Sequence, residues 1–130
     1  MLEIGTISSR PLGMIRLAIV GCRDYTNYDN FKTIVDQYIN EIGYPSEIVS
    51  GGCRGVDKPA ETYANNLNIP TKIFEADWAK YGKGAGPLRN DQMVEYCTHV
   101  LALPSKNSVG TLNTIAKAKN KARILKVVNI

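Results

Sequence analysis

Short apolar runs alternate with stretches of helical spacing along this 130-residue chain, and the alternation limits the folds open to it. Strands that alternate with helices build a parallel sheet with helices on both faces. We therefore predict an α/β fold, a Rossmann-like three-layer α/β/α sandwich with about five mostly parallel strands. The expected strands are Leu17–Val20, Ile48–Val49, Lys72–Phe74, Val100–Leu103 and Ile124–Val128, and the expected helices are Tyr28–Ile42, Val56–Leu67, Pro87–Cys97 and Gly110–Asn120.

The length of the chain fits one domain. We expect residues 14–130 to form this domain and residues 1–13, which lack periodicity, to be a leader or flexible extension. No apolar run approaches the ~20 residues that span a bilayer. The start of the chain also lacks the basic segment and apolar stretch of a secretory signal. We therefore expect a cytoplasmic protein without a membrane partner.

The three cysteines, Cys22, Cys53 and Cys97, form no Cys-x-x-Cys pair, so neither a disulfide framework nor a zinc site is indicated. We predict no metal and no cofactor. Cys53 could act as a nucleophile only beside a base. The single histidine, His99, begins an expected strand and so belongs at the sheet edge opposite the loops. A Cys–His couple is therefore not expected.

Positive charge gathers near the end of the chain. The net charge is +4, and residues 105–130 hold six lysines and arginines with no acid. Most of these cations fall near the end of an expected helix, where they suit the helix dipole. Nucleic-acid binding would favour basic residues interleaved with aromatic ones, and this tail has none. Nucleic acid is therefore not the expected partner.

The segment from Ile48 to Asp57 has the pattern of a strand, a glycine-rich turn and a helix start. Such a turn aims backbone N–H groups at one point, where a phosphate binds well. Asp57 can cap the helix or accept hydrogen bonds from ribose hydroxyls. Gly110 and Thr111 form a second turn of this kind. The candidate ligand-binding residues here are Ser50, Gly51, Gly52, Cys53, Gly55, Asp57, Gly110 and Thr111.

The loop after the first strand adds Gly21, Cys22 and Arg23 as candidate ligand contacts. Gly21 permits a sharp exit from the strand. The Arg23 guanidinium can bind phosphate oxygens at two points or pair with a neighbouring acid.

Asp77 to Gly86 is expected to be a long irregular loop, which is usually functional or disordered. Trp78 can stack on a base and Lys83 can meet phosphate, although Trp78 can equally plug the edge of the core. Arg89, followed by Asn90, is expected in the first turn of a helix, where the dipole disfavours a cation. A partner anion, from the ligand or from Asp77, is therefore expected.

Together these loops resemble the SLOG superfamily, and within it the YspA-like branch of small single-domain proteins. The residues that carry the resemblance are Gly21-Cys22-Arg23-Asp24, Ser50 to Asp57, Ala60-Glu61, Tyr63-Ala64, Asp77-Trp78, Tyr81-Gly82-Lys83, Ala85 to Asn90, and Gly110-Thr111. The resemblance implies a nucleotide-type ligand above the sheet edge. It also implies pairing into a homo-oligomer.

The resemblance leaves the reaction open. The related LOG enzymes cleave a nucleoside monophosphate with an arginine and a glutamate, but here Thr114 stands in place of the glutamate. We therefore expect binding of a nucleotide or a nucleotide-derived small molecule, including signalling forms that resemble ADP-ribose, for sensing or sequestration. One alternative is an N-glycosidase with Asp77 or Asp57 as acid/base and Arg89 on phosphate. A second is a nucleic-acid-associated factor in the manner of DprA.

Overall fold

A computed structural model describes residues 14–21, 27–51, 57–104, 109–121 and 123–129. Several predicted positions lie outside the described residues: the extension 1–13, and Cys22, Arg23, Gly52, Cys53 and Gly55. At Asp57 the description covers the backbone alone.

Five parallel strands form one sheet, and the fold class predicted from the sequence is confirmed. The strand order β4-β3-β2-β5-β6 places β2 at the centre, with the direction of winding reversing between β2 and β5. Leu17 of β2 lies between Ile48 of β3 and His99 of β5. The strands are β2 (Arg16–Gly21), β3 (Glu47–Ser50), β4 (Thr71–Ile73), β5 (His99–Leu103) and β6 (Ile124–Val127), each within one residue of its predicted ends.

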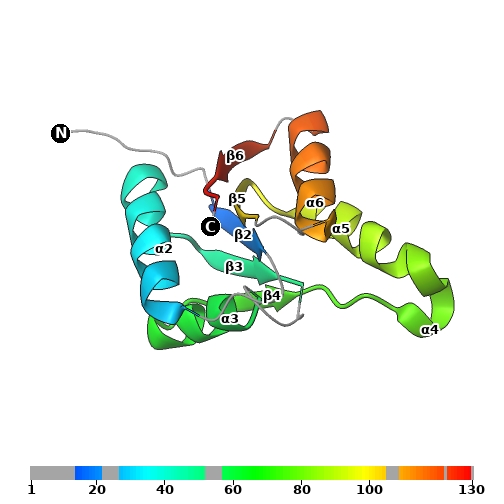
Figure 1. The fold of residues 1–130 in the computed structure, drawn as a ribbon. Coiled ribbons are helices and arrows are strands. Elements are labelled where there is room, and N and C mark those ends of the chain that lie inside the picture. The colour runs from blue at the N-terminus through cyan, green and yellow to red at the C-terminus, as the bar shows by residue number, and fades with distance from the viewer. Residues whose placement is uncertain (1–13, 22–26, 52–56, 105–108, 122, 130) are drawn as a thin grey trace.

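Two helices cover each face of the sheet (Figure 1). α2 (Tyr28–Ile42) and α3 (Asp57–Asn66) pack on one face, and α5 (Ala85–Tyr96) and α6 (Val109–Asn120) pack on the other. Among the described residues, no helix is long and apolar enough to cross a membrane.

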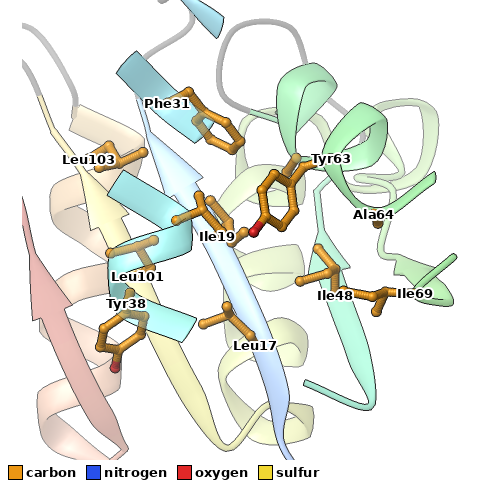
Figure 2. Packing of buried hydrophobic residues seen from close by; sticks show 12 residues of the cluster. Leu17, Ile19, Phe31, Tyr38, Ile48, Tyr63, Ala64, Ile69, Leu101 and Leu103 are labelled. Atoms are coloured by element: carbon orange, nitrogen blue, oxygen red, sulfur yellow. The ribbon is translucent and has the colours of Figure 1, made fainter. Parts of the chain in front are cut away.

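Alternate residues of each strand serve the two cores. Leu17 and Ile19 of β2 join Phe31 of α2 and Tyr63 of α3 in the cluster that Figure 2 shows. Ala18 lies between them in sequence and points to the other face, where Met93 of α5 packs. Successive strand side chains point to opposite faces, so a fully apolar strand fits a sheet that is covered on both sides.

The stretch from Asp77 to Gly86 is helical, so the prediction of a long irregular loop was wrong. α4 (Trp78–Tyr81) and a 3-10 turn, η2 (Gly82–Gly84), lead directly into α5 at Ala85. Glycines disfavour a helix but do not forbid one when a cap and packing support it. Pro87 is the third residue of α5, not the first as expected. The third position also suits proline, because the first four N–H groups of a helix have no partner within it.

Candidate functional site

The carboxyl end of β3 holds two predicted site residues, Ser50 and Gly51, both buried. Ser50 is fully buried, and its hydroxyl donates to Oε2 of Glu61 on α3 over 3.1 Å. A hydrogen bond to a carboxylate offsets the cost of burying a hydroxyl. Glu61 was not among the predicted site residues, although it lies inside the stretch that carries the family resemblance. Its contact with Ser50 brings a carboxylate to the start of the glycine-rich turn.

Arg89 joins this turn to α5. Its Nη1 donates to the carbonyl oxygen of Gly51 over 2.7 Å, and its Nε donates to Oδ1 of Asn90 over 3.0 Å. Arg89 is the fifth residue of α5, beyond the first turn in which it was expected. The hydrogen bond to Gly51 fixes the position of the backbone where the turn begins.

Asn90 extends the connection to α6. Its Nδ2 donates to Oδ1 of Asn113 over 3.1 Å, and the Asn90 side chain is 7% exposed. Asn113 lies in the same helix as the predicted residues Gly110, which is exposed, and Thr111, which is buried. A single asparagine inside a helix carries no sequence signal, which explains why Asn113 was not predicted. The end of β3, the start of α5 and the start of α6 are thus hydrogen-bonded in series.

Three other predicted site residues take no part in this series of hydrogen bonds as described: Gly21, Trp78 and Lys83. Gly21 ends β2 and pairs with Leu103 of β5, beside the point where the winding of the sheet reverses. In open α/β sheets, ligands bind beyond the carboxyl ends of the strands at such a point. Trp78 and Lys83 are exposed on an arm formed by α4 and η2, which Figure 1 shows beyond the arrowheads of β3 and β4.

Comparison with known proteins decides the family. The model of the YspA, cpYpsA-related SLOG family matches residues 15–81. The chain is also 32% identical over 112 residues to the Gene 61 protein of Mycobacterium phage D29, covering 82% of this chain and 90% of that one. The chain belongs to the YspA-related SLOG family. The resemblance stated from the sequence is thereby confirmed.

The fold of this SLOG protein is shared with a solved structure. DNA processing protein A (DprA) from Streptococcus pneumoniae superimposes with a TM-score of 0.69 at 20% sequence identity. The match covers 88% of this chain and 50% of the DprA chain, so the SLOG protein spans half the length of that structure. At this level of identity the likeness shows the fold alone.

The α6 helix of this SLOG protein carries no acid. Thr114, which stands where LOG enzymes have glutamate, is 2% exposed, and its hydroxyl donates to the carbonyl oxygen of Gly110 over 3.3 Å. This hydroxyl turns back onto its own helix, as threonines in helices often do. The sequence of α6 therefore supplies no carboxylate for general acid/base chemistry.

Asp77, a predicted catalytic residue, caps a helix in this SLOG protein. Its Oδ1 accepts a hydrogen bond from the backbone N–H of Lys80 over 3.1 Å, which is the N-cap geometry at the start of α4.

His99 and Cys97 lie at the amino end of the sheet, as predicted for His99. His99 begins β5, and burial lowers the pKa of its imidazole. Burial raises the pKa of the Cys97 thiol to about 11, so this thiol stays protonated and unreactive at neutral pH. Among the residues with described placement, no three His, Cys, Asp or Glu gather closely enough to hold a metal ion.

Proposed function

We propose that this protein binds a nucleotide or a nucleotide-derived small molecule, such as an ADP-ribose-like signal, in order to sense or sequester it. The observation that carries the proposal is the series of hydrogen bonds from Gly51 through Arg89 and Asn90 to Asn113. It ties the residue that follows β3 to α5 and α6, near the edge where ligands of such sheets bind. Membership of the SLOG family supports a nucleotide-related role.

The hydrogen bonds favour a ligand with phosphate groups. Phosphate binds where backbone N–H groups are held in a fixed orientation at the start of a helix, because no side chain has to be ordered on binding. Arg89 fixes the carbonyl of Gly51, and Asn90 fixes α5 against α6. In this proposal Arg89 positions the turn and contributes its positive charge to the phosphate.

The test is ligand affinity in a matched pair of arginine variants. Arg89→Ala is expected to weaken phosphate-bearing nucleotides by ~1.5–3 kcal/mol, measured by isothermal titration calorimetry. Arg123→Ala is the control, because Arg123 also donates to two carbonyl oxygens, those of Val94 and Glu95, but at the amino end of the sheet. Both variants lose a structural contact, and only Arg89→Ala should lose affinity. Unchanged affinity in Arg89→Ala would remove this residue from the site.

Cleavage of the ligand is the second candidate, and the contact of Ser50 with Glu61 is the observation in its favour. An N-glycosidase needs a carboxylate to activate water or stabilise the sugar cation. Incubation with nucleotides followed by chromatography distinguishes the candidates: a binder returns its ligand intact, and a glycosidase releases free base. If base appears, Glu61→Gln should keep affinity and abolish release, since glutamine retains an oxygen for Ser50.

A further inference from the structure

The arm formed by α4 and η2 exposes two aromatic rings and two lysines, which we call the arm surface: Trp78, Lys80, Tyr81 and Lys83. Trp78 is 51% exposed and Tyr81 46% exposed, and both lysines are exposed as well. Single exposed apolar side chains are common, whereas apolar side chains grouped in one exposed patch mark interaction sites. The arm stands apart from the sheet (Figure 1).

Local geometry holds the two rings in place. Trp78 and Tyr81 are three residues apart in one helical turn, so their side chains are neighbours on the same side of α4. Trp78 is seated against Gly86: a Cβ at that glycine would lie 3.3 Å from Cη2 of the indole. The Nζ of Lys80 lies 5.1 Å from the centre of the Tyr81 ring, within the range of a cation–π contact. The surface is thus preorganised and still open to solvent.

The lysines of the arm surface have no acidic partner among the described residues, unlike four other lysines. Lys80 and Lys83 take part in none of the described ion pairs, and the carboxylate of Asp77 is engaged as the cap of α4. The paired lysines lie elsewhere on the molecule: Lys32 with Asp36, Lys117 with Asp91, Lys121 with Glu95, and Lys126 with Glu41. Uncompensated cations beside exposed rings favour a polyanion as the partner.

We propose that the arm surface binds single-stranded nucleic acid, with bases stacked on Trp78 and Tyr81 and phosphates at Lys80 and Lys83. Stacking on aromatic rings flanked by cations is how proteins bind single strands without reading their sequence. A mononucleotide has one base, whereas this surface offers two rings and two cations, so it suits successive nucleotides. The inference goes beyond the proposed function and does not depend on Arg89.

The test uses the full chain and the fluorescence of Trp78, the only tryptophan in the protein. Titration with a 20-nucleotide oligothymidylate, and with oligouridylate to compare DNA with RNA, should quench this fluorescence. A duplex of the same length should bind more weakly. Measured with a labelled oligonucleotide, Trp78→Ala should weaken binding about 5- to 150-fold. Tyr44→Ala, which removes an exposed ring from the connection between α2 and β3, should leave binding unchanged.

Salt dependence separates local contacts from general attraction to a basic protein. The double variant Lys80→Ala/Lys83→Ala should reduce the slope of log affinity against log salt by about 1.4, since each phosphate contact with a single strand contributes about 0.7. Lys119→Ala/Lys121→Ala removes the same charge from the end of α6 and should leave the slope unchanged.

Four outcomes would overturn the inference. The first three are an oligonucleotide that leaves Trp78 fluorescence unchanged, equal weakening by both lysine pairs, and a Trp78→Ala variant that dissociates a dimer seen by sedimentation. Equal quenching by mononucleotide and oligonucleotide would also overturn it, by assigning the arm to the nucleotide site. The proposed function would fail on a different result. Nucleotides would then not bind, or would bind Arg89→Ala as tightly as the wild type.

Discussion

Two buried tyrosines on the same face of the sheet differ in what their hydroxyls contact. Tyr38 of α2 is 4% exposed, and its hydroxyl has no hydrogen-bond partner among the residues that the structure describes. Tyr63 of α3 is also buried, and its hydroxyl donates to Oδ1 of Asp36. A buried polar atom without a partner costs free energy, whereas a hydrogen bond to a carboxylate stabilises the folded state.

Phenylalanine should therefore have opposite effects at the two positions. Tyr38→Phe is expected to raise the free energy of unfolding by up to about 1 kcal/mol, because it removes the unpaired hydroxyl. Tyr63→Phe is expected to lower it by about 1 kcal/mol or more. Urea denaturation followed by circular dichroism measures both. A loss of stability in Tyr38→Phe would mean that its hydroxyl bonds a water molecule in the small pocket that it lines with Gln37 and Lys126.

The effect at Tyr63 should depend on pH. The hydrogen bond from Tyr63, followed by that from Lys32, holds the pKa of Asp36 below its ordinary value near 3.8. A lowered carboxyl pKa stabilises the fold above the unfolded pKa, and this contribution is lost as the pH falls through the folded value. The difference in stability between wild type and Tyr63→Phe should therefore be full at pH 7 and shrink below about pH 4. A difference that stayed constant down to pH 2 would contradict the role of Asp36.

Among elements, the strands and the four long helices could be predicted because hydrophobic spacing reports burial directly. The arm could not be predicted, because Gly82, Gly84 and Gly86 indicate a loop by local preference alone. It is helical because Asp77 caps α4 and Trp78 packs on Gly86. The helix propensities of single residues do not include such packing. Of the candidate site, the strand-end positions were predicted, whereas the contact of Arg89 with Gly51 depends on where α5 begins.

The packing of Trp78 on Gly86 should be sensitive to one added methyl group. Gly86→Ala places a carbon 3.3 Å from the indole, closer than most contacts, so the ring must move. The expected result is a shift in the emission maximum of Trp78, measured by steady-state fluorescence. Gly84→Ala is the control, because no described residue that is distant in sequence comes within 4 Å of its added carbon. Equal spectra for both variants would contradict the contact.

The contact between α5 and α6 should tolerate one change at Asn113 and not another. Asn113→Asp keeps an oxygen that accepts from Nδ2 of Asn90. Asn113→Leu leaves that buried Nδ2 without a partner and should cost about 1–3 kcal/mol of unfolding free energy. Thermal denaturation compares the two variants. Equal melting temperatures for both would show that the amide is satisfied elsewhere.

At the scale of the whole molecule, one sheet separates two cores of different character. Leu101 and Leu103 of β5 face α2, and Ala102 between them faces α5 and α6. Small residues on the second face let its helices approach the sheet closely, which explains how a short chain fills both layers. Because the same strands serve both cores, we expect the two cores to unfold together.

Substitutions on opposite faces should therefore disturb the same cooperative transition. Leu101→Ala should lower the free energy of unfolding by about 2–5 kcal/mol through a cavity on the α2 face. Ala102→Leu should lower it by about 1–3 kcal/mol by overpacking the α5/α6 face. Each should shift circular dichroism and Trp78 fluorescence together in urea. Transitions that separate in either variant would mean that the two faces unfold independently.

The pairing of β2 with β5 has a consequence for how the chain acquires its shape during synthesis. The backbone N–H of Arg16 donates to the hydroxyl of Thr98, and the backbone N–H of Thr98 donates to the carbonyl of Arg16, a separation of 82 residues. Of the described strands, β2 leaves the ribosome first, and it must wait for β5, the fourth of the five, before both its edges are covered. Until then an apolar strand remains exposed to water with an unpaired edge. Nascent chains with such an exposed strand depend on chaperones or on rapid elongation to avoid aggregation.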